Sequence, residues 1–142
     1  MKKNYLRTYS FQAKEVQTFG IMILMMRYGI MYNQGDILLI PIPFSDLKTN
    51  KKRPVLVISN SFYNEKTEDI IVAAITSNLS EKEFSLLIYN EDMKEGTLKT
   101  ASLIRIDKIY TLSKSIVIKK FGMLKPEVVE KAKEKLYDLF SN

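Results

Sequence analysis

The sequence predicts a mainly β, β-rich α+β protein: a small barrel of five to six strands with a C-terminal helix. Two observations predict this fold class. Short apolar runs rich in Val and Ile recur between polar loops across residues 35–120, and runs of this kind are typical of strands. Residues 126–140 instead carry apolar side chains at three- and four-residue spacing, which is the period of an amphipathic helix.

The composition bounds the domain count and the chemistry. A chain of 142 residues with 46% hydrophobic and 27% charged residues suits one soluble globular domain. It has no cysteine, which excludes disulfides, a thiol nucleophile and cysteine metal sites. It also has no histidine, so the commonest proton-transfer group and metal ligand is missing. We therefore expect no metal and no cofactor.

Residues 1–30 differ from the rest of the chain. They carry five basic residues against one acidic residue, a net +4, which leaves only +2 of the total +6 to residues 31–142. Their apolar run, Phe19–Met26, is short of the roughly 20 residues that a membrane span needs. Three interpretations stay open: a loosely packed or disordered extension, an upstream mis-start with Met31 as the natural first residue, and a functional anchor. We predict an N-terminal extension at 1–30 and one domain at 31–142.

The expected elements follow from apolar runs and their breakers. Pro41 and Pro43 end the first strand, and Pro54 begins the second, where its missing N–H is tolerated. Gly122 is expected to break the β pattern, and Pro126 to open the helix, which runs to Phe140. The predicted strands are Ile37–Ile40, Val55–Ile58, Asp69–Ile75, Phe84–Ile88, Ser102–Asp107 and Ser115–Ile118.

The stretch Gln34–Ser59 holds two apolar runs joined by a polar loop, and Arg53 stands where the loop meets the second run. An arginine before a strand is commonly a solvated residue, but its planar guanidinium also suits bidentate binding of a phosphate. Lys51 and Lys52 beside it add a local positive field. A lysine pair in a loop also serves solubility alone.

Other candidate residues lie near strand ends. Thr76 and Ser77 end the most hydrophobic strand, where a hydroxyl either bonds to local backbone or is held for a surface site. Phe44 follows Pro43 and suits either core packing or stacking on a nucleobase. Asp36 and Asp46 suit turns, with a general base or a metal ligand as the alternative.

Several motifs in order carry a family resemblance. Gly35-Asp36-Ile37, Pro41–Phe44 and Lys51–Ile58 are followed by Val72–Ser77, Leu103–Lys108, Ile118–Leu124 and the terminal helix. This series resembles the MazF/PemK toxins of type II toxin–antitoxin pairs over about residues 32–140.

The resemblance implies an SH3-like barrel that forms a homodimer in the cytoplasm, away from any membrane. It implies an endoribonuclease, an mRNA interferase, that cuts single-stranded RNA without a metal. Arg53 and Thr76 match the family's catalytic positions, and the loop from Phe44 to Lys52 matches the segment over the RNA groove. A cognate antitoxin is implied as partner, with operator DNA bound through the toxin–antitoxin complex. The RNA-binding residues are expected to be Phe44, Asp46, Lys51, Lys52 and Ser77.

The mechanism that this resemblance implies suits a chain without histidine. RNA carries its own nucleophile, the 2′-OH, so the protein needs to orient the attack and stabilise charge on the phosphate. Two other functions stay open: a catalytically inactive SH3-like module that binds nucleic acid or an antitoxin, and a related barrel toxin that poisons gyrase. The pairing of Arg53 with Thr76 argues against the gyrase poison.

Overall fold

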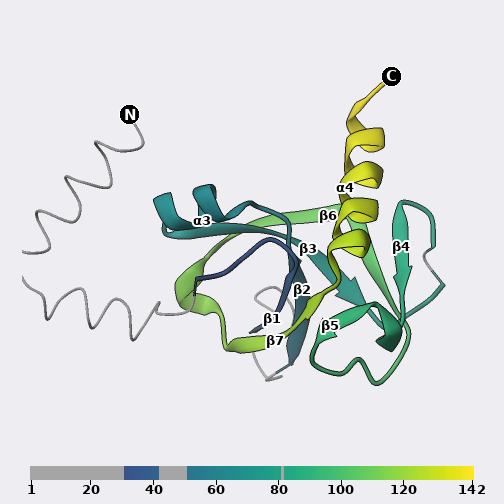
Figure 1. The fold of residues 1–142 in the computed structure, drawn as a ribbon, viewed down its shortest axis with the longest axis horizontal. Coiled ribbons are helices and arrows are strands. Elements are labelled where there is room, and N and C mark those ends of the chain that lie inside the picture. Colours follow the sequence, from purple (N-terminus) through teal and green to yellow (C-terminus); the bar gives the residue numbers. More distant parts are fainter. Residues whose placement is uncertain (1–30, 42–50, 81) are drawn as a thin grey trace, which may run out of the picture. The chain divides into compact units, whose positions relative to one another are not determined.

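The computed structural model describes residues 31–41, 51–80 and 82–142. Their main element is an antiparallel sheet of seven strands in the spatial order β4-β6-β3-β2-β1-β7-β5 (Figure 1). The sheet is curled, with a C-terminal helix packed against it, so the predicted mainly β fold class is confirmed. The strands are β1 (Asp36–Pro41), β2 (Lys52–Val57), β3 (Asp69–Thr76), β4 (Ser85–Ile88), β5 (Met93–Glu95), β6 (Ser102–Ser113) and β7 (Lys119–Leu124).

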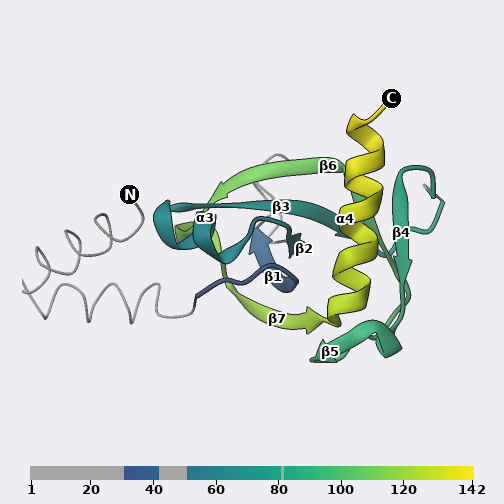
Figure 2. The same ribbon diagram turned by 45° about the horizontal axis from the view of Figure 1, so that its top comes forward.

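Both faces of the central strands are apolar. Side chains alternate between the faces of a strand, and alternate residues of β1 and β2 belong to different clusters. The first cluster includes Ile37 and Leu56, and the second includes Leu38, Val55 and Val57. In Figure 2 the long strands β3 and β6 run side by side, and β7 lies across the curled sheet from them. β1 and β2 are therefore buried on both faces.

Helix α4 (Pro126–Phe140) covers the first cluster. Pro126 stands in its first turn, where a missing N–H costs no hydrogen bond. Val128, Val129 and Ala132 are buried against the sheet, in the same cluster as Ile37 and Leu56. The helix predicted from residue 126 to residue 140 is therefore confirmed.

The sequence analysis missed a short helix, α3 (Ser61–Lys66), which lies between the strands predicted at Val55–Ile58 and Asp69–Ile75. Asn60 caps its start by accepting a hydrogen bond from the Tyr63 backbone N–H at 2.8 Å. The buried Asn64 side chain donates to the Tyr32 carbonyl at 2.8 Å. A helix of six residues that is held by polar contacts has no repeating apolar pattern, so sequence reasoning does not detect it.

The end of the sheet also differs from the prediction. Ser115–Ile118 is not a strand, because β6 continues to Ser113 and a 3-10 turn, η2 (Lys114–Ile116), follows it. The Ser113 hydroxyl caps this turn by accepting from the Ser115 N–H at 3.2 Å. The apolar Val117 packs from the turn onto the second cluster. Ile118, the last residue of the run, is exposed, and its backbone N–H donates to the Leu39 carbonyl of β1 at 2.8 Å.

Gly122 does not break the β pattern; it lies inside β7, which the sequence analysis missed together with β5. β5 follows a single 3-10 turn, η1 (Asn90–Asp92), and pairs with β7, Met93 opposite Leu124. A Cβ on Gly122 would lie 2.5 Å from the Glu95 carbonyl oxygen and 2.7 Å from the Met93 methyl. Glycine is needed here because the β5 backbone approaches so closely.

We therefore expect Gly122→Ala to lower the free energy of unfolding by about 1–3 kcal/mol, the usual cost of overpacking. Urea unfolding followed by circular dichroism measures the change. Lys119→Ala, at an exposed position of the same strand, is the matched control and should change stability by less than about 0.5 kcal/mol. A Gly122→Ala protein as stable as the control would contradict the close approach.

Residues 32–142 form one compact unit. Residues 1–30 lie outside the described part of the chain, so the predicted extension stays a prediction. No described helix is long and apolar enough to cross a membrane.

Candidate active site

The pairing of β2 with β3 brings the two predicted catalytic residues together. Val55 lies opposite Ala74, and Val57 lies opposite Val72. Continuing this register by two residues places Arg53 opposite Thr76, the last residue of β3. Directly opposed residues of antiparallel strands have Cβ atoms about 4.5–5.5 Å apart. The guanidinium and the hydroxyl can therefore contact one small group.

Arg53 and Thr76 lie on one face of the sheet, which we call the site face. Every second residue of a strand lies on the same face. The site face therefore also carries Val55 and Val57 of β2, and Val72 and Ala74 of β3. Val55 and Val72 are buried in the second cluster. The two candidate residues therefore stand on well-packed strands, as a preorganised site needs.

Arg53 is exposed at the start of β2, opposite the buried Ile40 of β1. None of the ion pairs among the described residues involves it. Lys51 and Lys52 beside it are also exposed, and strand alternation directs Lys52 to the opposite face. The charge of Arg53 is thus held at the surface, where it suits an anionic partner.

The Thr76 hydroxyl is oriented by a local contact. Its oxygen accepts a hydrogen bond from the Asn78 backbone N–H at 3.1 Å, and the Asn78 side chain accepts from the Ser80 hydroxyl at 2.7 Å. This is the local backbone bond that such a hydroxyl commonly makes. It uses an acceptor lone pair, so the O–H can still donate. Ser77 follows outside the strand and is exposed.

The predicted RNA-binding set is only partly described by the structure. Lys51, Lys52 and Ser77 flank the strand ends that carry Arg53 and Thr76. Phe44 and Asp46, with most of the predicted RNA-binding loop, lie outside the described residues.

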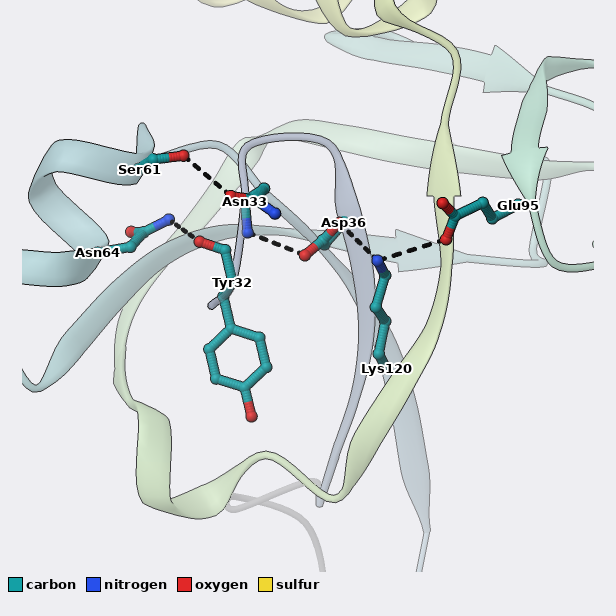
Figure 3. A network of polar contacts seen from close by, with 7 residues as sticks. All are labelled: Tyr32, Asn33, Asp36, Ser61, Asn64, Glu95 and Lys120. Atoms are coloured by element: carbon teal, nitrogen blue, oxygen red, sulfur yellow. Dashed lines mark hydrogen bonds and ion pairs between the residues drawn. The ribbon is translucent and has the colours of Figure 1, made fainter. Parts of the chain in front are cut away.

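Asp36 belongs to a structural network, not to the site (Figure 3). Its carboxylate is fully buried and accepts from the Asn33 N–H at 2.9 Å, closing a turn. Lys120 of β7 neutralises it at 3.3 Å and also reaches Glu95 of β5 at 3.4 Å. The turn reading of Asp36 is correct. Among the described residues no three Asp or Glu side chains gather where a metal could bind.

The two residues whose pKa is shifted, Lys114 and Tyr32, lie away from Arg53 and Thr76, near the start of β3 and helix α3. Burial lowers the pKa of Lys114, and the carboxylates of Asp69, Glu65 and Glu68 oppose that shift. Lys114 donates to the Asn64 carbonyl and follows Ser113, which pairs with Asp69 at the start of β3. Burial, and then the charge of Asp36, raises the pKa of Tyr32. Both residues contact the α3 region, so we assign them to structure.

A second arginine on the site face was missed by the sequence analysis. Arg105 of β6 lies opposite Ala74 and forms an ion pair with Asp107, with 3.3 Å between Nε and Oδ1. The sequence analysis placed Arg105 in the predicted strand Ser102–Asp107 and in one motif of the family resemblance, without giving it a role. Alternation puts Arg105 and Leu103 on one face of β6, but the neighbouring strand was needed to identify that face as the site face.

Similar folds occur among solved toxin structures. A MazE–MazF complex from Deinococcus radiodurans matches with a TM-score of 0.62 at 19% identity, covering 78% of this chain and 96% of that chain. An endoribonuclease bound to its cognate antitoxin, from a mycobacterial species, matches at 0.59 and 18%, covering 76% and 91%. The Mycobacterium tuberculosis toxin MazF-mt6 matches at 0.58 and 20%, covering 74% and 95%. At these identities the likeness concerns the fold.

The sequence itself matches a family model. The model describes the PemK-like, MazF-like toxin of type II toxin–antitoxin systems, and it matches residues 33–140. That range begins just before β1 and includes every described strand and α4 to its last residue. The match covers most of the chain and agrees with the fold. The chain therefore belongs to the PemK-like, MazF-like toxin family of type II toxin–antitoxin systems.

Proposed function

We propose that this toxin is a metal-independent endoribonuclease that cuts single-stranded RNA, mRNA in the cell. The observation that carries the proposal is the register of β2 with β3, Val55 opposite Ala74, which, continued by two residues, puts Arg53 level with Thr76. Membership in the toxin family and the likeness to a structure described as an endoribonuclease support it. A chain without histidine or cysteine also suits a reaction whose nucleophile comes from the substrate.

In the proposed reaction the RNA 2′-OH loses its proton and attacks the adjacent phosphorus; the bond from phosphorus to the 5′-oxygen breaks, and the leaving oxygen takes up a proton from solvent. Arg53 stabilises the negative charge that grows on the non-bridging oxygens. We do not assign it as the base, because a guanidinium stays protonated in proteins. Thr76 donates its O–H to the same phosphate, while Asn78 orients the oxygen. The products are a 2′,3′-cyclic phosphate and a 5′-hydroxyl.

We infer that a cognate antitoxin is the protein partner, since two of the similar structures are toxin–antitoxin complexes. An exposed arginine with lysines beside it suits an acidic antitoxin segment as well as RNA. We propose that the toxin acts as a homodimer in the cytoplasm and binds operator DNA only through the antitoxin.

Incubation of the full chain with mixed-sequence RNA in EDTA tests the enzyme proposal. We expect fragments with 5′-hydroxyl ends, which polynucleotide kinase labels without prior phosphatase, and 2′,3′-cyclic phosphate ends, identified by mass spectrometry. A 2′-deoxy nucleotide at the mapped cut position is the control and should abolish cleavage there. Intact RNA in the presence of a folded protein would favour the inactive binding module. Cleavage only after addition of a divalent metal would overturn metal independence.

A further inference from the structure

Tyr110 of β6 lies on the site face. It pairs with Val72 of β3, and Leu112 pairs with Ile70. Val72 and Ile70 are buried in the second cluster, against which Leu112 also packs, so these pairs lie on the site face. Ile109, the residue before Tyr110, packs against the first cluster on the other face. Strand register and core contacts therefore agree on the face to which the tyrosine belongs.

A bulge in β6 sets this orientation. Residues 106–108 of β6 have no partner on β3, which shifts the register of the two strands. Continuous pairing would instead place Asp107 opposite Val72 and turn Tyr110 to the other face. Bulges redirect side chains in this way, and they are over-represented beside active sites. The bulge thus puts an aromatic side chain where regular alternation would put a carboxylate.

The surroundings of Tyr110 leave its ring accessible. β4 pairs with β6 only from Ser102 to Arg105, so β6 continues past the end of β4 with β3 as its one described neighbour there (Figure 2). Tyr110 lies in this part of β6 and is 41% exposed. A tyrosine ring presents a flat apolar face on which another planar group can stack. Strand preference alone also favours tyrosine here, and a stacking partner is what distinguishes the two roles.

The distance from Thr76 suits single-stranded RNA. Val72, the partner of Tyr110, is four residues before Thr76 on β3, a separation of about 13 Å along a strand. Ala74 lies between them on the same face and is only partly buried. Because its side chain is a single methyl group, a base can pass over it towards the tyrosine ring.

Sites for single-stranded RNA combine cations along the backbone with aromatic rings on which bases stack. We propose that Tyr110 stacks on a nucleobase of the bound RNA, about two nucleotides from the phosphate between Arg53 and Thr76. This inference rests on the proposed function, because it needs RNA on the site face. It extends the site from the ends of β2 and β3 to the middle of β6.

A cycle of protein and RNA changes tests the contact. The probe, an uncleavable RNA, carries a 2′-deoxy nucleotide at the position that the wild-type chain cuts. A set of these RNAs also carries one abasic nucleotide, placed in turn at each position on either side of the cut. We expect Tyr110→Ala in the full chain to bind the probe about tenfold more weakly, the cost of one lost stacking contact. In wild type one abasic position should cost the same factor, and Tyr110→Ala should bind that RNA no more weakly than it binds the probe.

Three controls separate stacking from other effects. Tyr110→Phe keeps the ring and should bind the probe within about twofold of wild type. Stacking neutralises no phosphate, so Tyr110→Ala should keep the wild-type slope of log K against log salt. Tyr137→Ala removes a tyrosine that is 73% exposed on α4, the helix that covers the other face of the sheet. It should keep the wild-type affinity for every RNA of the set.

The outcomes distinguish this inference from the function on which it rests. A folded Tyr110→Ala protein with wild-type affinity, or one weakened equally on every abasic RNA, overturns the stacking role and leaves the nuclease proposal intact. If Tyr110→Ala unfolds, Tyr110→Thr, which keeps the strand preference, is judged by the same two criteria. Wild-type protein that binds RNA without cutting it overturns the nuclease proposal alone, and the abasic set is then made in the unmodified RNA. Wild-type protein that neither cuts nor binds RNA overturns both.

Discussion

Arg53→Ala should lower kcat for RNA cleavage by about 10²–10³, the cost of removing one group that stabilises charge in a transition state. Arg53 is exposed, and the continued β2–β3 register places it opposite Thr76, so its loss removes the cation nearest the proposed reacting phosphate. Binding of the uncleavable RNA should weaken much less, since that charge develops fully only during the reaction. Single-turnover cleavage with saturating protein measures the chemical step directly.

Two variants separate this role from simple charge. Lys52→Ala removes the same charge one residue earlier, on the opposite face of β2. As a predicted RNA-binding residue Lys52 should affect binding, but at saturating protein its loss should leave kcat within about threefold of wild type, an effect below 1 kcal/mol. Arg53→Lys keeps the charge but loses the planar fork, so we expect an intermediate kcat. Equal losses in Arg53→Ala and Lys52→Ala would show that Arg53 supplies only a general positive field.

Thr76→Val should lower kcat by about 10–100-fold. Valine keeps the branched shape and the strand preference, but it cannot donate to a phosphate, and a hydrogen bond to a charged group contributes about 1.5–3 kcal/mol. Thr76→Ser keeps the hydroxyl and should restore most of the rate. Both are measured in the same single-turnover assay as Arg53→Ala.

The local bond of Thr76 calls for one further control. Its hydroxyl accepts from the Asn78 N–H, so valine also removes a contact within the turn after β3. Ser77→Ala changes the exposed hydroxyl next in sequence and should leave kcat unchanged. A Thr76→Val protein with full activity and a lowered melting temperature would assign the hydroxyl to the turn alone.

Sequence reasoning selected Arg53 and Thr76 as candidates through family resemblance. Taken alone, Arg53 is as easily explained as a solvated residue, and Thr76 as a hydroxyl that bonds to local backbone. It missed Arg105 for a specific physical reason. Alternation shows which residues of one strand share a face, but it does not show which strand lies beside it. Arg105 pairs with Ala74 on β3. This pairing depends on a shift of register between β3 and β6, two strands far apart in the sequence.

The same limit explains the errors in the fold. α3 is short and held by polar contacts such as Asn64 with Tyr32. β5 has three residues and depends on its pairing with β7, where Gly122 allows close approach. Ser115–Ile118 had the composition of a strand, but a 3-10 turn covers its first two residues and only Val117 of the run packs against the second cluster. In each case the element depends on contacts with residues far away in the sequence, which a local pattern does not show.

The sequence by itself determined that this protein is mainly β with a C-terminal helix, because apolar periodicity and helix-start signals are local, and its motifs carried the resemblance to the toxin family. It also determined that histidine and cysteine take no part in its chemistry. Only the tertiary structure decided the register of β2 with β3, which when continued aligns Arg53 with Thr76, and the pairing of Arg105 with Ala74. The physical reason is that strand register depends on long-range packing and pairing, and a shift of one residue would turn every side chain to the other face.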